Sequence, residues 1–267
     1  MAHDPLFLST AIEAAIAAGR IHRKYFRQGI AIEKKGPIDL VTAADLEVER
    51  EFRALIAERF PSHAVLGEEQ GAGAVGDTRA THRWIIDPVD GTTNFAHGIA
   101  LFCVSIALEI DGRLDIGVVY DPMADELFSA ERGEGARLNG RPMRVSDSDR
   151  LIDALLCTGF PYSVHVDRHA MVEVFEAFLG RARGIRRLGS AALDLCYVAA
   201  GRLDGFYEDG LHPWDMAAGA LLVEEAGGRV SGYDNVPLDI FKRRLISSNG
   251  KLHDAMVGVI NSVQRPV

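Results

Sequence analysis

The sequence predicts an α/β (α+β) fold in which layers of helices pack against layers of strands. Its 267 residues, of which 48% are hydrophobic and 25% charged, are typical of a globular protein with a substantial core. Segments with apolar residues at helical spacing are mixed with short apolar runs throughout the chain. Two such runs flank Asp111-Gly112, a dipeptide that strongly indicates an antiparallel hairpin. This mixture favours a layered architecture.

The chain is expected to begin with two helices. Apolar residues recur at helical spacing through residues 6–27. A second helix is predicted from Thr42 to Phe60, because Thr42 is a suitable N-cap and Asp45 follows three residues later. The other elements expected before residue 82 are a basic loop at 34–37, a strand at 64–66 and a surface excursion at 71–81.

The most informative segment is Trp84-Ile85-Ile86-Asp87-Pro88-Val89-Asp90-Gly91-Thr92-Thr93-Asn94. Its first three residues predict a buried strand, which Pro88 is expected to end. The following turn would bring the Asp87 and Asp90 carboxylates together at the carboxyl end of that strand. Two close carboxylates repel each other unless a cation or a proton lies between them. The amides of Gly91 to Thr93 can open a helix that attracts an anion. The segment therefore indicates a metal-assisted reaction on a phosphate.

The remaining elements continue the mixed pattern. Strands at 101–110 and 114–120 should pair as the hairpin, followed by more strands and turns through residue 145. The later elements expected are strands at 152–159, 205–208 and 245–246, and helices at 169–179, 191–200, 215–226 and 252–263. Two subdomains are predicted, residues 1–145 and residues 146–267.

Charge and composition argue against several classes of function. The 38 acidic and 29 basic residues give a formal charge of −9, which argues against direct nucleic-acid or membrane-surface binding. No apolar run reaches membrane-spanning length, and the first residues lack the features of a signal peptide. Cys103, Cys157 and Cys196 each lie in an apolar run, which predicts buried free thiols in a reducing cytoplasm.

Several acidic residues lie at the edges of predicted elements. Capping and dipole compensation explain Asp45 and Asp215 without any ligand, because both lie in the first turn of a predicted helix. Glu68 follows a strand and could equally belong to a solvated turn. Asp87 and Asp90 are harder to explain by structure alone, because their motif combines two close carboxylates with a proline, a glycine and two threonines.

Three segments in this order resemble the signatures of the inositol monophosphatase family, whose members are magnesium-dependent, lithium-sensitive phosphatases. They are Gly67-Glu68-Glu69, the segment from Asp87 to Thr93, and Trp214-Asp215-Met216-Ala217-Ala218. The resemblance extends from Lys34 to about Asn249. Gly159-Phe160-Pro161 and residues 186–201 resemble the bacterial SuhB-type members most. The resemblance implies an α-β-α-β-α sandwich of the inositol monophosphatase and sugar phosphatase type.

The resemblance also implies two or three Mg²⁺ ions in an acidic site. Glu68, Asp87 and the carbonyl of Val89 would bind the first ion. Asp87, Asp90 and Asp215 would bind the second, and a third, weaker ion would lie near Glu68. These are the hard oxygen ligands that Mg²⁺ prefers. Val89 replaces the isoleucine of other members, which should matter little because only its carbonyl is used.

The catalytic residues implied by the family are Glu68, Asp45 and Thr92. Thr92 and Asp45 would orient and deprotonate the attacking water, and the ions would activate it and stabilise the leaving alkoxide. Arg186 and its neighbour Arg187 could equally form a surface pair or an interface contact. The substrate-binding residues implied by the family are Glu68, Val89, Asp90, Gly91, Thr92, Arg186, Gly189, Ala191, Glu208 and Asp215.

The expected reaction is the hydrolysis of myo-inositol monophosphate to myo-inositol and phosphate. Relatives with this type of metal site act as fructose-1,6-bisphosphatase, histidinol-phosphatase or nucleotide 3′-phosphatase. A second phosphate would need additional basic residues, for which Lys34, Lys35, Arg186 and Arg187 are available. An alternative of another class is an accessory protein of the transcription or RNA-processing machinery that acts through protein contacts. A homodimer is expected by analogy with the family.

Overall fold

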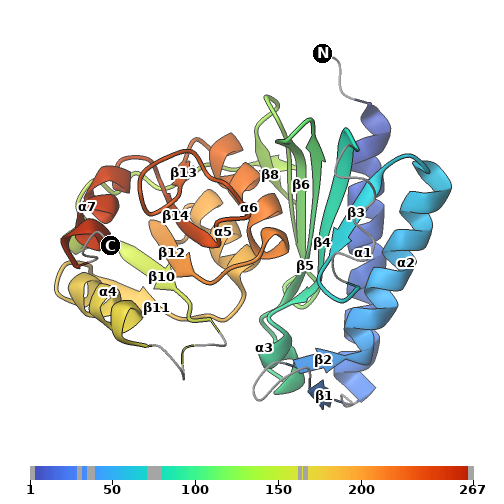
Figure 1. Cartoon of the computed structure of the whole chain (residues 1–267), viewed down its shortest axis with the longest axis horizontal. Helices are drawn as coiled ribbons and strands as arrows, with labels where there is room; N and C mark the ends of the chain where they lie inside the picture. The colour runs from blue at the N-terminus through green and yellow to red at the C-terminus, as the bar shows by residue number, and fades with distance from the viewer. Residues whose placement is uncertain are drawn as a thin grey trace.

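The computed structural model is built of five layers in the order helix, sheet, helix, sheet, helix (Figure 1). It describes residues 4–28, 32–34, 40–70, 80–161, 164 and 168–263. From the first layer to the last, the helices are α1 (Pro5–Gln28) and α2 (Ala43–Arg59), then α5 (Ala191–Ala199) and α6 (Pro213–Glu225), then α4 (His169–Leu179) and α7 (His253–Val263). Three apolar cores, one at each outer helix–sheet boundary and one around α5 and α6, hold these layers together. The predicted α-β-α-β-α sandwich is thus confirmed.

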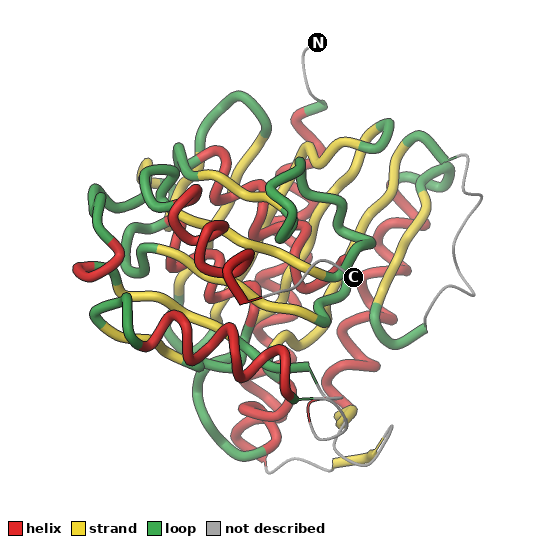
Figure 2. The backbone as a smooth tube through the Cα atoms, turned by 60° about the vertical axis from the view of Figure 1, so that its left-hand side comes forward, coloured by secondary structure: helices red, strands yellow, loops and turns green. Residues whose placement is uncertain are grey.

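The first sheet has seven strands that follow each other in chain order. Figure 2 shows the strands in yellow and the helices in red. They are β3 (Ala64–Gly67), β4 (His82–Asp90), β5 (Cys103–Ile110), β6 (Arg113–Asp121), β7 (Glu126–Glu131), β8 (Ala136–Leu138) and β9 (Arg141–Pro142). Only the β3–β4 pair is parallel. The hairpin at Asp111-Gly112 is confirmed, with φ of 49° and 77° at its two turn residues.

The second sheet has five strands in the order β11-β10-β12-β14-β13. Their bounds are β10 (Leu155–Thr158), β11 (Gly184–Arg186), β12 (Gly205–Asp209), β13 (Arg229–Ser231) and β14 (Arg244–Ser248). Strands β11 and β13 were not predicted, because three residues are too few to show a periodicity. A 3₁₀ turn, η2 (Leu151–Asp153), replaces the start of the strand predicted at 152–159.

The chain passes from the first sheet to the second between Pro142 and Leu155. The predicted subdomain boundary at residues 145/146 lies in this connection. Helices α5 and α6 pack against both sheets in one shared core. The division into two subdomains stays a prediction.

The end of β4 differs from the expectation. Pro88 does not end the strand, which continues to Asp90 with a shift of register between Asp87 and Asp90. A proline is tolerated at such a bulge because no ladder hydrogen bond needs its missing N–H. The buried His22 of α1 donates Nε2–H to the Pro88 carbonyl at 2.8 Å. Gly91 then turns the chain with φ of 95°, and the short helix α3 (Thr92–Ala96) begins as predicted.

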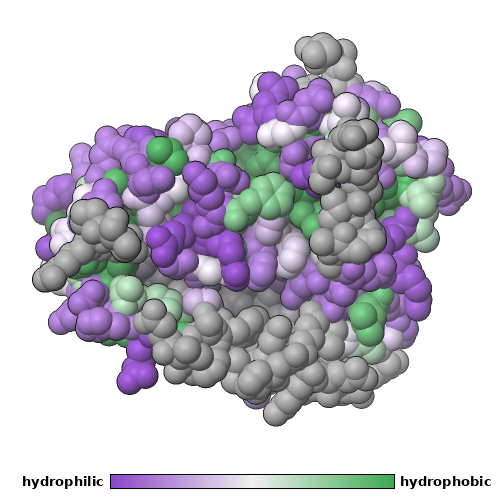
Figure 3. All heavy atoms as spheres, viewed as in Figure 1, coloured by the Kyte–Doolittle hydropathy of each residue, from purple (hydrophilic) through white to green (hydrophobic). Residues whose placement is uncertain are grey.

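Some of the predicted segments lie outside the described residues. The predicted basic loop lies outside the described residues except for the backbone of Lys34, which belongs to β1 (Ile32–Lys34), paired with β2 (Leu40–Thr42). Most of the predicted excursion at 71–81 also lies outside them. All three cysteines are buried and free, as predicted. No helix in the described ranges has the length and apolar character needed to cross a membrane. Figure 3 shows hydrophilic side chains over much of one face, with small separate apolar patches.

Candidate active site

Three carboxylates converge where β4 meets the start of α6. Asp87 and Asp90 come from the bulged end of β4, and Asp215 comes from the first turn of α6. One oxygen from each lies within 4.8 Å of the others. Asp87 and Asp90 are buried, with exposed fractions of 2% and 8%. The structure thus brings together three of the predicted metal ligands, although Asp215 is more than 120 residues away along the chain.

The electrostatics of this group call for a cation. Burial, followed by repulsion from Glu68, Asp90 and Asp215, raises the pKa of Asp87 well above its ordinary value. Burial and repulsion from Asp90 likewise raise the pKa of Asp215. Glu68 therefore lies close enough to Asp87 to raise the pKa of Asp87, although Glu68 is outside the group of three. Without a cation, these acids are stabilised by holding protons.

Asp90 also joins the two halves of the chain. Its Oδ2 accepts hydrogen bonds from the hydroxyl of Ser190 at 2.6 Å and from the amide of Ala192 at 2.7 Å. Its Oδ1 accepts a bond of 3.3 Å from the amide of Ala191. These groups form the N-terminus of α5, where a negative charge is favourable. They oppose, but do not overcome, the rise in the pKa of Asp90 caused by burial.

Asp215 lies in a capping box at the start of α6. The helix begins at Pro213, two residues before the predicted start, because proline is well suited to the first helical position. Oδ2 of Asp215 accepts from the His212 amide at 2.7 Å. The His212 ring stacks on Trp214 with centroids 4.8 Å apart. Capping and membership of the acidic group are therefore compatible for Asp215.

Asp45 and Thr92 each have a structural partner. Asp45 is fully buried, and its Oδ2 accepts from the amide and the hydroxyl of Thr42, which confirms the predicted capping box. The Thr92 hydroxyl donates to the Val89 carbonyl at 2.8 Å. Asp45 contributes to the raised pKa of Asp87 through its charge. Joint activation of a water by Thr92 and Asp45 stays a prediction.

The segment that carries Glu68 is held by a residue that the sequence did not single out. Glu49 of α2 is fully buried and paired with Arg53, with 2.6 Å between Oε1 and Nη2. Its other oxygen, Oε2, accepts from the amide of Glu69 at 2.7 Å. A Cβ on Gly67 would lie only 2.5 Å from Oε1 of Glu49. The glycine before Glu68 is thus required by the close approach of this carboxylate.

The residues expected on the substrate side also reach this region. The carbonyl of Gly189 would lie 3.3 Å from a Cβ on Gly91, so the loop before α5 packs on the turn that follows β4. Glu208 extends from β12, and its pKa is raised by burial first, then by the charges of Asp194 and Asp215. A Cβ on Gly159 would lie 2.0 Å from Oε2 of Glu208, so only glycine leaves room for this carboxylate.

The two adjacent arginines differ in placement. Nη1 of Arg186 donates to the carbonyl of its own neighbour Ile185 at 3.3 Å. Nη1 of Arg187 instead lies 2.6 Å from the position of a Cβ on Gly189. The positive charge of Arg187 lowers the pKa of Glu208, against the larger rise caused by burial. The structure therefore places Arg187 beside the predicted substrate-side residues, whereas the substrate role of Arg186 stays a prediction.

Three more supporting residues were missed by the sequence reasoning. Ser190 is the N-cap of α5, which its position before a predicted helix could have revealed. Asn94 donates through Nδ2 to the carbonyls of Leu101 and Leu188, both at 2.9 Å, and so ties α3 to the loop before α5. Asp194 is 1% exposed, and burial raises its pKa. Asp194 is the only charged residue in the apolar segment from Ala191 to Ala200, which could have indicated that it is buried.

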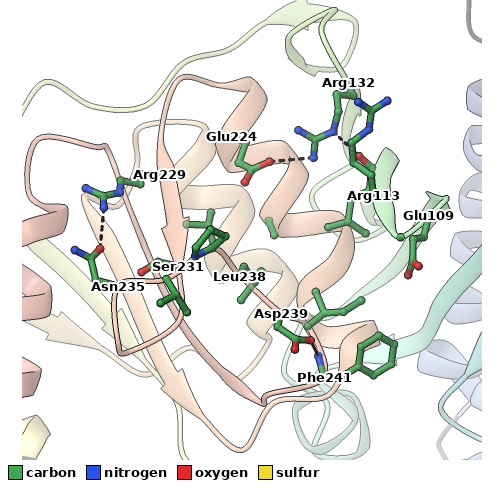
Figure 4. A pocket seen from close by; sticks show the side chains of 17 residues that line it. Glu109, Arg113, Arg132, Glu224, Arg229, Ser231, Asn235, Leu238, Asp239 and Phe241 are labelled. Atoms are coloured by element: carbon green, nitrogen blue, oxygen red, sulfur yellow. Dashed lines mark hydrogen bonds and ion pairs between the residues drawn. The ribbon is translucent and has the colours of Figure 1, made fainter. Parts of the chain in front are cut away.

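A hollow of about 580 Å³ elsewhere on the protein contains none of the predicted site residues (Figure 4). It lies between the β5–β6 hairpin, α6 and the connection from β13 to β14. Charged side chains at its edge already have partners: Arg132 pairs with Glu224 at 3.0 Å, and Arg229 donates to Asn235 at 2.8 Å. The acidic group on β4 and α6 is the better candidate site.

Comparisons with known proteins match almost the whole chain to one family. The model of the family described as "Inositol monophosphatase family" matches residues 5–265. The protein "Nus factor SuhB" of Pseudomonas aeruginosa is 44% identical over 259 residues, covering 95% of each chain. "Inositol-1-monophosphatase" of Mesorhizobium japonicum is 42% identical over 262 residues, covering 97% of each. The crystal structure of the extragenic suppressor protein suhB from Bartonella henselae is 41% identical, with a TM-score of 0.89 and coverage of 96% of this chain and 98% of that one.

Proposed function

The chain belongs to the inositol monophosphatase family, and we propose that it is a Mg²⁺-dependent hydrolase of inositol monophosphates. The observation that carries this proposal is the group of Asp87, Asp90 and Asp215, with an oxygen from each within 4.8 Å of the others. A relative named inositol-1-monophosphatase supports the choice of substrate. The products would be myo-inositol and phosphate.

The donor set fits Mg²⁺. It consists of carboxylate oxygens at a buried position, which a small, hard divalent cation prefers. Asp87, Asp90 and Asp215 would hold one ion, and Glu68, Asp87 and the Val89 carbonyl would hold another, with a third near Glu68. When bound, Mg²⁺ supplies Lewis-acid stabilisation of the charge that develops on the reacting oxygens.

The chain's own groups would position the substrate and move a proton. The amides of Gly91 and Thr92 would donate to the phosphate at the start of α3. Asp45 would accept the proton of the attacking water, with the Thr92 hydroxyl orienting that water. On the leaving side, the Glu208 carboxylate would accept hydrogen bonds from the alcohol, while Gly189 and Ala191 contact its ring.

Replacing Asp215 by Asn tests the proposal. Asn keeps an oxygen that can accept from the His212 amide but removes the charge, so the fold should persist. We expect phosphate release from inositol-1-phosphate with Mg²⁺ to fall by about 100-fold or more. The matched control is Asp254→Asn, because Asp254 also lies in the first turn of a helix but is exposed and paired with Arg229. Retained turnover in Asp215→Asn would overturn the metal assignment.

A second candidate is a role in the transcription machinery, supported by the name Nus factor SuhB of the relative from Pseudomonas aeruginosa. The formal charge of −9 favours contacts with proteins over direct contacts with nucleic acid. Complementation of a gene deletion by the inactive Asp215→Asn variant would support this role, and failure to complement would argue against it. The expected homodimer is tested by sedimentation of the purified protein.

A further inference from the structure

The buried histidine of α1 reaches the bulged end of β4. His22 is 0% exposed, and its Nε2 lies 2.8 Å from the Pro88 carbonyl oxygen. Burial is the main cause that lowers the pKa of His22 to about 4, so the ring is neutral near pH 7 and carries a single N–H, on the nitrogen that faces the carbonyl. Nδ1 is then a buried acceptor without a hydrogen-bond partner in the described part of the chain. An apolar side chain would avoid the free-energy cost of that acceptor, so packing alone does not account for a histidine here.

The peptide group between Pro88 and Val89 is held from both sides. Its carbonyl oxygen accepts from His22, and its N–H donates to Oδ1 of Asp87 at 3.0 Å. Because this peptide is trans and planar, its carbonyl and N–H point in opposite directions, and the bond to His22 fixes the direction of the Val89 N–H. A hydrogen bond to the carbonyl also polarises the peptide, which strengthens its N–H as a donor. His22 therefore acts on Oδ1 of Asp87 through one peptide group.

The imidazole is itself fixed by the segment that follows the bulge. Its centroid lies 6.0 Å from that of the Phe95 ring and 5.8 Å from that of the Phe102 ring, both in edge-on geometry. Phe95 belongs to α3, the helix that begins at Thr92. The donor on His22 thus has a defined direction relative to the acidic site.

We propose that His22 is a positioning residue for the metal site, whose bond to the Pro88 carbonyl holds the Asp87 carboxylate in one orientation toward Mg²⁺. This inference rests on the proposed phosphatase function, in which Asp87 is a ligand of two ions. Groups that hydrogen-bond around metal ligands orient them, and their loss typically weakens metal binding by about 10- to 100-fold. Since one peptide separates His22 from Asp87, we expect an effect at the lower end of this range.

Isothermal titration calorimetry with Mg²⁺ on two variants of nearly the same shape tests the proposal. His22→Met removes the donor, and Mg²⁺ affinity should fall by about tenfold. His22→Gln keeps an N–H that can reach the Pro88 carbonyl, so it should restore most of this loss. The control is Thr10→Val, because Thr10 is a buried polar residue of the same helix that accepts from Arg59, at the end of α2 opposite to Asp45. Thr10→Val should lower stability and leave Mg²⁺ affinity unchanged.

The kinetics of phosphate release from inositol-1-phosphate give a second readout. The Mg²⁺ concentration for half-maximal rate should rise by about tenfold in His22→Met, whereas the rate at saturating Mg²⁺ should change little. An unchanged Mg²⁺ affinity in His22→Met, or an equal loss in His22→Met and His22→Gln, would overturn the inference and leave the proposed function intact. If the native protein binds Mg²⁺ but releases no phosphate, the proposed function fails and the affinities of the variants still decide the inference. If the native protein binds no Mg²⁺, both fail.

The native protein provides a test that does not depend on the folding of a variant. The ¹⁵N resonance of His22 Nε2 reports the strength of its hydrogen bond to the Pro88 carbonyl. Binding of Mg²⁺ to Asp87 should change this bond through the shared peptide and so shift the resonance. A shift on addition of Mg²⁺ supports the inference, and a resonance that does not move overturns it.

Discussion

At the residue scale, the acidic site depends on side chains and glycines that hold its ligands in place. Gly67 is the sharpest example, because Oε1 of Glu49 lies where a Cβ would be. We expect Gly67→Ala to push Glu49 away from the amides of Glu69 and Gln70 and so displace Glu68. Affinity for Mg²⁺ and turnover should both fall, by about tenfold or more, as for other losses of support around metal ligands.

The control for this change is Gly258→Ala. Gly258 lies within α7, and a Cβ there meets no atom within 4 Å. Alanine should therefore raise the melting temperature slightly, because it favours the helix more than glycine does. Isothermal titration calorimetry with Mg²⁺ measures the loss of Mg²⁺ affinity expected for Gly67→Ala. Unchanged Mg²⁺ affinity in Gly67→Ala would show that Glu49 does not position Glu68.

The same scale shows what the sequence could predict about the site. Asp87 and Asp90 were found because their motif is unusual, and Asp215 because its segment resembles a family signature. Glu49 was missed because a glutamate inside a helix is normally an exposed residue. The sequence also could not distinguish Arg186 from Arg187, because adjacent residues of an extended chain point in different directions.

At the element scale, the longer helices and the hairpin were predictable because each shows several turns or alternations of its pattern. The short strands β11 and β13 were not, since their pairing is decided by neighbours far along the chain. Pro88 misled the prediction for β4 because the bulge that accommodates it depends on pairing with β5. The predicted N-cap at Thr42 succeeded because its partner is only three residues away.

Helix α5 packs closely against α6. A Cβ on Gly219 of α6 would lie 2.5 Å from Cβ of Leu195 on α5. Gly219→Ala should therefore force the two helices apart and lower the free energy of unfolding by about 1–3 kcal/mol. Activity should fall too, because α5 binds Asp90 through its N-terminus and α6 carries Asp215.

Denaturant unfolding of a double-mutant cycle measures this coupling. Leu195→Ala alone creates a cavity, but combined with Gly219→Ala it removes the close contacts that the new Cβ would make with Cγ and Cδ1 of Leu195, so that only the contact with Cβ stays. The combined loss of stability should be smaller than the sum of the two single losses. Strictly additive losses would contradict the proposed contact between the helices.

At the scale of the whole molecule, the stacking of layers assembles the site from distant parts of the chain. The first sheet supplies Asp87 and Asp90, and the central helix layer supplies Asp215 and the amides that bind Asp90. The order of the layers was predictable only through the family resemblance. The sequence pattern indicates where helices and strands lie along the chain, but it does not show which of them pack side by side. Folding therefore concentrates acidic groups in the interior, which makes stability depend on protons and metal.

The stability of the folded protein should therefore depend on both pH and Mg²⁺. The pKa values of Asp87 and Asp215 are raised in the folded protein, so these carboxyls hold protons that the unfolded chain releases. Without metal, their contribution to stability is present at low pH and is lost as the pH rises through the folded pKa values. Mg²⁺ must displace these protons, so its stabilising effect should grow with pH. We expect the rise in melting temperature caused by saturating Mg²⁺ to be larger at about pH 8 than at about pH 5.5, by several degrees.

Thermal unfolding in Mg²⁺ and in EDTA measures this difference, and Asp215→Asn should reduce it because one titrating ligand is gone. An effect of Mg²⁺ that stays constant or grows toward acid pH would show that the ion does not compete with protons at these carboxylates.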